Sequence, residues 1–302
     1  ELQDPIGGGK PQDKIPIPRI IVGVDKPTGP DGAVQAGPGF SRSANDLQTT
    51  IDQYRAVMRL DAGAHKFKIG AELNHADLFN LFIQNATGAL HFRNAADLEA
   101  GLLSPGTGNF NTTSSPANLV SGAVEGAIGN FSSTGDPRDA AADFTRSIYS
   151  VFAQDDWQIT DQLGAVLGVR VDWFDGGQPK LNTNYAQRYG FANTTGFSNI
   201  DPIVMPRLAL TYDMDDFAVF SRAQLRAGVG IFSGGDPLVF FANAFQNDGR
   251  GFAQGTTQNA PCPAGQIDVV VNGQFTGIPE CIRTAGAAVA AQGLGDTQSI
   301  DP

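Results

Sequence analysis

Residues 163–174 alternate between apolar and mixed side chains over about 12 consecutive positions. One face would carry Leu163, Ala165, Leu167, Val169, Val171 and Trp173, and the other Gly164, Val166, Gly168, Arg170, Asp172 and Phe174. Because successive side chains of a β-strand point to opposite faces, the pattern predicts one long strand. Strands of soluble proteins are usually about five or six residues long, whereas a tilted strand needs about 9–11 to cross a bilayer. The segment therefore predicts a membrane-crossing strand.

The preceding segment, residues 147–159, has a similar length and pattern. A short connection at residues 160–162 joins the two, so we expect a hairpin. Asp155 interrupts the apolar face near the end of this strand, where a carboxylate can reach water or lipid headgroups. Trp157 is typical of an aromatic girdle, because its ring is apolar and its indole N–H is polar.

The same pattern recurs elsewhere in the chain. Residues 50–60 and 65–74 predict a second hairpin around the turn at 61–64, and residues 205–213 and 225–232 predict a third pair. Residues 15–24 predict a weaker strand, since Pro16 and Pro18 lack ladder donors and suit an edge or a loop extension. We expect about seven strands in an all-β fold.

Long segments rich in Gly, Asn, Ser and Pro separate the hairpins, at about residues 25–49, 75–146, 175–204 and 233–302. Short periplasmic turns at one end and long extracellular loops at the other are typical of transmembrane β-barrels. Such long loops would argue against a compact soluble domain. Short helices are expected at 94–101, with an Asn N-cap and a terminating Gly, and at 285–291.

Charge and motifs exclude several functions. The net charge of −11 disfavours nucleic-acid binding, which needs a basic face. The sequence has no run of 18 apolar residues that would predict a transmembrane helix. It contains no nucleophile elbow, zinc-protease motif or phosphate-binding loop, so we expect neither an enzyme nor a cofactor.

The two cysteines, Cys262 and Cys281, lie in one loop-like segment without a nearby His. This spacing favours a local disulfide in an oxidising compartment over a pair of free thiols. His65, His75 and His91 fit no metal-binding spacing and are expected to be ordinary surface or turn residues.

Three charged residues are candidate site residues because they fall on the mixed face of the predicted strands: Arg170, Asp172 and Arg226. They could contact a ligand or a plug domain, or they could form interstrand charge pairs in a wet barrel interior. Both interpretations remain open. We expect the aromatic residues of the loops to pack locally: Phe79, Phe82, Phe240, Phe241 and Phe245.

Several segments together resemble the TonB-dependent outer-membrane receptors. Residues 150–157, followed by 163–172, resemble a strand–turn–strand signature of that family, and residues 65–72 resemble another of its barrel strands. Residues 77–88, 225–232 and 243–247 resemble more specifically the Oar-like subgroup.

The resemblance implies a Gram-negative outer membrane location, contact with membrane lipid, and uptake of a small-molecule or peptide ligand driven by the TonB complex. Receptors of this kind resemble a 22-stranded barrel with a plugged lumen. About seven readable strands, with no plug or TonB box, predict that residues 1–302 are a partial barrel domain, incomplete at both ends. The alternative is a surface receptor or adhesion protein that imports nothing.

Overall fold

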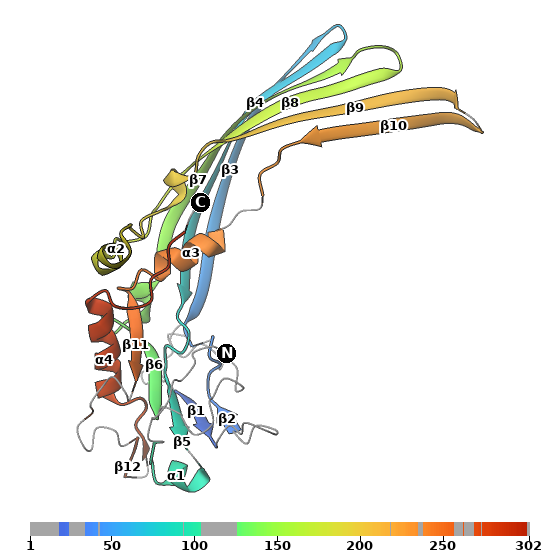
Figure 1. Ribbon diagram of the computed structural model, residues 1–302. Helices are drawn as coiled ribbons and strands as arrows, with labels where there is room; N and C mark the ends of the chain where they lie inside the picture. Colours follow the sequence, from blue (N-terminus) through green and yellow to red (C-terminus); the bar gives the residue numbers. More distant parts are fainter. Residues whose placement is uncertain are drawn as a thin grey trace.

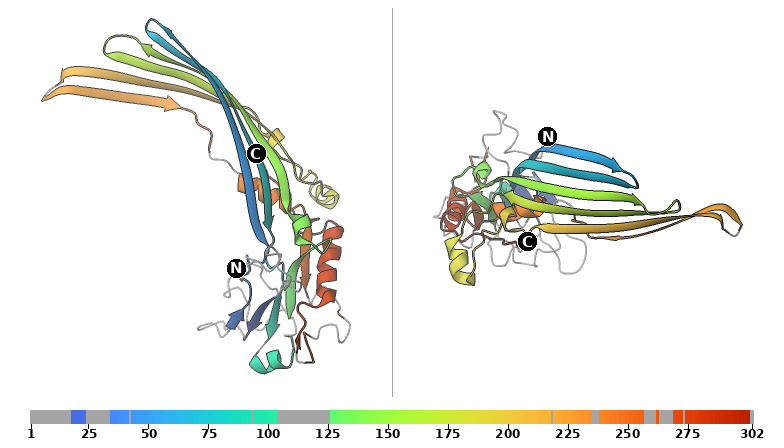
Figure 2. Two further views of the ribbon diagram at one scale, coloured as in Figure 1. Left: turned by 180° about the vertical axis from the view of Figure 1, so that it is seen from behind. Right: turned by 90° about the horizontal axis from the view of Figure 1, so that it is seen from above.

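The computed structural model describes residues 18–23, 34–41, 43–92, 94–103, 126–217, 219–234, 238–256, 262, 269–272 and 274–300. A long, six-stranded antiparallel sheet extends from a smaller unit that combines a five-stranded sheet with a helix (Figures 1 and 2). None of the described helices is long and apolar enough to span a membrane.

The long sheet has the strand order β10-β9-β8-β7-β4-β3. Its strands are β3 (Asn45–Ala62), β4 (His65–Phe82), β7 (Ala142–Gln158), β8 (Leu163–Gly176), β9 (Ile203–Phe217) and β10 (Phe220–Gly230). Every neighbouring pair is antiparallel. The β3–β4, β7–β8 and β9–β10 connections are short and lie together at one end, which we call the short-turn end (Figure 1). In the described part of the chain the sheet is open, with β3 and β10 at its edges.

The three predicted hairpins are confirmed, and the hairpin of β7 and β8 has the expected turn. Several strands are longer than predicted. β4 continues to Phe82, and β7 already begins at Ala142, where its ladder with β4 starts as Asn80↔Ala142. These extensions lie away from the short turns and pack against other segments of the chain. Their side chains therefore do not alternate simply between apolar and polar, and the sequence pattern did not reveal them.

The weaker strand predicted at residues 15–24 is present in part but lies outside the long sheet, which has six described strands and not about seven. Within residues 15–24, the structure describes β1 (Arg19–Val22), which is not part of the long sheet. It lies between β2 (Val34–Ala36) and β5 (Ala89–Phe92) in the five-stranded sheet, with an antiparallel and a parallel neighbour. Pro16 and Pro18 precede this strand, so they interrupt no ladder within it.

The smaller unit, which we call the loop-end domain, assembles from segments that are distant in sequence. Its sheet has the order β11-β6-β5-β1-β2, including β6 (Ala127–Ser132) and β11 (Phe252–Thr256). Helix α4 (Glu280–Ala291) packs on β11 and β6 (Figure 1). A two-stranded ladder, β12 (Val270–Val271) with β13 (Gln274–Phe275), precedes the helix. The long connections therefore contain strands as well as the short helices that were expected in them.

A hydrophobic core joins α4 to the five-stranded sheet. Ile282 is fully buried against a cluster that consists of Leu90, Phe92, Ala127, Phe131 and Val269. The helix approaches β11 very closely, because a Cβ atom on Gly255 would lie 2.0 Å from the Ile282 carbonyl oxygen. A Cβ atom on Gly286 of the helix would likewise lie 2.8 Å from the Ala253 carbonyl oxygen.

Cys262 and Cys281 form a disulfide, with their Cα atoms 5.5 Å apart. Both pack against the core, and Cys281 lies in the first turn of α4, so the bond ties the start of the helix to Cys262.

Removing this bond should destabilise α4. For a sequence separation of 19 residues, loss of the cross-link is expected to cost about 3 kcal/mol through the added chain entropy of the unfolded segment. Hydrogen exchange of the α4 amides should therefore accelerate in the Cys262→Ser/Cys281→Ser variant, while the amides of β7 and β8 keep their protection. Unchanged protection of α4 would contradict this assignment.

The remaining helices are short. α1 (Ala95–Glu99) confirms the expected cap, since the Asn94 side chain accepts a hydrogen bond from the Asp97 N–H. The helix expected at 285–291 is longer and begins at Glu280. α2 (Thr183–Tyr189) and α3 (Leu238–Gln246) were not predicted, and neither were the 3-10 turns η3 (Pro137–Ala140) and η4 (Phe197–Asn199).

Candidate ligand site on the mixed face of the long sheet

The register of the long sheet separates its two faces. Directly paired residues of antiparallel strands lie on the same face of a sheet. The face that carries Val169 therefore also carries Ala153, Ile69 and Met58. We call this side the apolar face; its large side chains are exposed, Met58 at 61% and Ile69 at 49%. The opposite side, which includes Arg170 and Asp172, is the mixed face.

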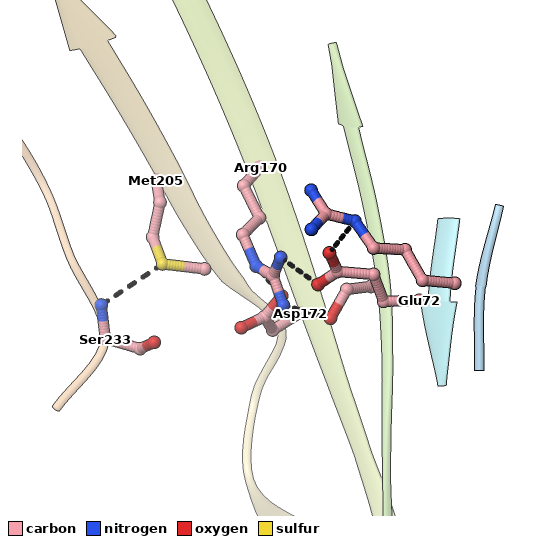
Figure 3. A network of polar contacts seen from close by, with 7 residues as sticks. Glu72, Arg170, Asp172, Met205 and Ser233 are labelled. Atoms are coloured by element: carbon pink, nitrogen blue, oxygen red, sulfur yellow. Dashed lines mark hydrogen bonds and ion pairs between the residues drawn. The ribbon is translucent and has the colours of Figure 1, made fainter. Parts of the chain in front are cut away.

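Arg170 lies at the centre of a polar network on the mixed face (Figure 3). Its Nε lies 2.7 Å from the Asp172 Oδ1, and a terminal guanidinium nitrogen donates to the Ser150 Oγ at 2.6 Å. It also forms an ion pair with Glu72, whose other carboxylate oxygen lies 2.8 Å from the Arg55 Nε. The network spans β3, β4, β7 and β8, because Arg55, Glu72, Ser150 and Asp172 are consecutive partners in one row.

The network forms one wall of a cavity of about 720 Å³. Phe240 and Phe241 of α3 add apolar side chains to the lining, as does Ile203, which pairs with Asp172 in the sheet. The segment before α3 is held by a hydrogen bond from the Ser233 N–H to the Met205 sulfur at 3.1 Å (Figure 3). The cavity therefore offers both ionic and apolar contacts to a ligand.

Helix α3 is held over the mixed face by aromatic packing. Phe241 stacks on Phe197 of η4 with ring centroids 3.9 Å apart, and Phe245 stacks on Phe144 of β7 at 4.2 Å. Leu78 and Ala142 complete the buried cluster. The expectation that the loop aromatics pack locally thus applies to Phe241 and Phe245, whereas Phe240 is 75% exposed and lines the cavity.

The structure brings together Arg170 and Asp172 but places Arg226 elsewhere. Arg226 pairs in register with Thr211, which pairs with Gly164, six positions along β8 from Arg170. It lies exposed on the mixed face, towards the short-turn end. Sequence reasoning missed Glu72, Arg55 and Ser150. The alternation placed each of them on a predicted strand, but only the pairing order β3-β4-β7-β8 shows that they meet.

Comparison with known protein families supports the interpretation of the sheet as a membrane wall. Residues 7–302 match the family model described as an outer membrane beta barrel domain. The chain belongs to this family. No curated protein and no solved structure matches it.

Outer membrane β-barrels turn an apolar band towards lipid and enclose a polar interior, so we expect the apolar face of this sheet to contact lipid and the mixed face to line the interior. Near the short turns, the apolar face carries an aromatic group. The ring of His65 stacks with Trp157 and Phe67, with centroids 5.2 and 5.6 Å apart. Such groups are typical of the girdle at a membrane interface.

The carboxylate that interrupts the apolar face is paired within this girdle. The Asp155 Oδ2 lies 2.7 Å from the His65 Nδ1, and the Asp155 side chain is only 17% exposed. Its other oxygen is buried and has no hydrogen-bond partner among the described residues. His65 thus lies beside the turn and is partly exposed, as expected, but it also pairs with a carboxylate.

Removing the imidazole that pairs with Asp155 should destabilise the protein. His65→Phe keeps the ring stacking but leaves the Asp155 carboxylate unpaired, which should lower the free energy of unfolding by about 1–3 kcal/mol. Urea unfolding of the protein in detergent measures the change. Asp155→Leu in the same background should recover most of the loss, because the apolar face accepts an aliphatic residue there. Additive effects of the two substitutions would contradict the coupling.

The other two histidines, His75 and His91, also lie in strands. The His75 Nδ1 lies 2.8 Å from the Ser147 Oγ, and His91 is buried at 2% exposure in β5 of the loop-end domain. The expectation of a surface or turn position is therefore wrong for His91. Within the described ranges, no group of three His, Cys, Asp or Glu side chains could hold a metal ion.

Proposed function

We propose that the chain forms part of a TonB-dependent, Oar-like receptor that takes up a ligand across the outer membrane. The observation that carries the proposal is the cavity on the mixed face, which is lined by both the Arg170 network and Phe240.

The position of the cavity supports capture from the loop end. Helix α3 and the Ser233 segment are supplied by the connection after β10, so a rearrangement of this connection would change access to the cavity. The segments that resemble TonB-dependent receptors include residues 150–157 and 163–172, which contribute Ser150, Arg170 and Asp172 to the site. By this resemblance, the short turns face the periplasm and TonB supplies the energy.

Depletion of the growth medium tests the proposal although the ligand is unidentified. The wild-type strain, a strain that lacks this protein and a strain that lacks TonB are grown in one rich medium, and the spent media are compared by mass spectrometry. We expect at least one solute to be consumed by the wild type and to remain in both mutant cultures. Identical media from the wild type and the strain without this protein would contradict uptake.

A second candidate function is surface attachment without import. The observation in its favour is the loop-end domain, which is a folded unit with its own core and disulfide. In that case, the strain without the protein would lose attachment to a surface or to other cells, and the loss of TonB would have no effect.

A further inference from the structure

One row of the mixed face is positively charged although the chain as a whole is acidic. Starting at β3, the register places Arg59, Lys68, Gln154, Gly168, Arg207 and Gly230 side by side across all six strands. This row, which we call the cationic row, contains three positive charges and no carboxylate, in a chain with a net charge of −11. It lies one step from the row of Arg170, towards the short turns.

Neutral groups hold two cations of this row, Lys68 and Arg207, in place, and the ring beside Lys68 also contacts Arg55 of the neighbouring network. The Lys68 Nζ lies 5.9 Å from the centre of the Phe152 ring, and the Arg55 guanidinium lies 5.5 Å from the same ring. The Phe152 ring itself lies across Gly70, where a Cβ atom would come within 2.4 Å of it. A cation over an aromatic face is oriented without losing its charge.

Arg207 is held in a similar way. Its side chain lies across Gly168, where a Cβ atom would come within 2.6 Å of the Arg207 Nε, and its terminal nitrogen donates to the Gln154 Oε1 at 2.8 Å. The amide of Gln154 is oriented in turn by donating to the Asp156 carboxylate at 2.7 Å. In the part of the chain that the structure describes, no carboxylate forms an ion pair with Arg59, Lys68 or Arg207.

This arrangement differs from the Arg170 network. There, Glu72 and Asp172 balance the charges of Arg55 and Arg170, so the network is locally neutral. The next row towards the short turns contains Asp61 and Asp156 on either side of Lys66, and is also mixed. Uncompensated cations are therefore concentrated in the cationic row. They attract anions over roughly the Debye length, about 10 Å at 0.1 M salt.

We propose that the cationic row binds an anionic ligand, with carboxylate or phosphate groups, on its way along the inner wall. The row extends over four strand spacings from Arg59 to Arg207, or about 19 Å at about 4.8 Å per strand. This width suits a ligand with more than one negative group. The inference rests on the proposed function only in assigning this face to the ligand path.

Binding to the purified full-length protein tests the proposal independently of transport. Citrate and inorganic pyrophosphate serve as probes for the two anionic chemistries, and the cation spermidine serves as the control of opposite charge. Isothermal titration calorimetry in detergent at low salt should detect binding of at least one anion, weakened by added salt, and no binding of spermidine. Preference for citrate or pyrophosphate identifies the ligand as a carboxylate or a phosphate.

Substitutions locate the site. Arg59→Gln/Lys68→Gln/Arg207→Gln should weaken anion binding by about tenfold or more, as expected for the loss of charge-assisted hydrogen bonds. Lys180→Gln/Arg188→Gln/Arg250→Gln changes the net charge equally at exposed positions outside the long sheet and should leave binding unchanged. The variant Arg59→Lys/Arg207→Lys should retain binding, because it keeps both positive charges, and this assigns a loss in the triple variant to the missing charge.

Two results would overturn the proposal: failure of the wild-type protein to bind either anion, or equal binding by the two triple variants. Either result would leave TonB-dependent uptake standing if the depletion experiment shows it. Conversely, anion binding without TonB-dependent depletion would support the cationic row and contradict the proposed uptake.

Discussion

Gly255→Val is expected to displace α4 from the loop-end domain. The new Cβ atom would lie 2.0 Å from the Ile282 carbonyl oxygen and 3.0 Å from the Gly286 nitrogen, both of them helix backbone that no side-chain rotation can move. The helix must therefore move away from β11 and expose Ile282, which is fully buried. Overpacking and the loss of this burial together should cost about 3 kcal/mol or more.

Gly164→Val is the matched control, because Gly164 also lies within a strand but a Cβ atom there would meet nothing closer than 3.7 Å. Limited proteolysis and hydrogen exchange of α4 should separate the two variants. The Gly255 variant should lose protection in α4 while the long sheet stays protected, and the Gly164 variant should resemble the wild type. Equal protection of α4 in both variants would show that the helix does not pack on β11.

Arg170→Met should have the largest effect on the long sheet. Asp172 is only 6% exposed in its side chain, and the substitution removes the cation that lies 2.7 Å from it. Glu72 keeps its contact with Arg55, so Asp172 becomes the unpaired charge. Breaking a largely buried ion pair by removing one partner is strongly destabilising, and partial exposure of Arg170 reduces the expected loss to about 2 kcal/mol.

A second substitution separates stability from ligand recognition. Arg170→Met/Asp172→Asn removes the unpaired charge and should recover most of the free energy of unfolding measured in urea. Uptake of the solute found by medium depletion should nevertheless stay impaired, because the cavity has lost its central cation. Recovery of both properties would mean that Arg170 only balances the charges within the sheet.

The long sheet could be predicted from the sequence because the bilayer constrains it directly. Alternation over residues 163–174 and 147–159 is what a sheet with one face in lipid requires, and it located β8 and the end of β7 to within a few residues. The turn between them and the third strand pair, predicted at 205–213 and 225–232, follow in the same way. Outside the lipid, this constraint disappears, which is why the start of β7 and the end of β4 were missed.

The loop-end domain could not be predicted in this way. Its strands are short, such as the three residues of β2 and the four of β5, and its sheet draws on segments from before β3 to beyond β10. The feature that joins α4 to β11 is a pair of glycines, Gly255 and Gly286, which in sequence resemble ordinary loop glycines.

Only part of the candidate site could be predicted, because its residues come from several strands. Arg170 and Asp172 attract attention as charges on an otherwise apolar strand. Glu72 and Arg55 belong to a different hairpin, and the cationic row depends on six strands in register. Such sites require the pairing order, which alternation within one strand does not contain.

The ligand path and the lipid contact both depend on one face of the long sheet lying against lipid while the other lines a polar interior. Single spin-labelled cysteines at positions 166–171 of β8, in the full-length protein in lipid vesicles, test this orientation most directly. Accessibility to oxygen, which partitions into lipid, should be high at 167, 169 and 171 and low at 166, 168 and 170, and accessibility to a water-soluble nickel reagent should alternate in the opposite sense. Equal accessibility to the nickel reagent at all six positions would contradict the two-faced membrane wall.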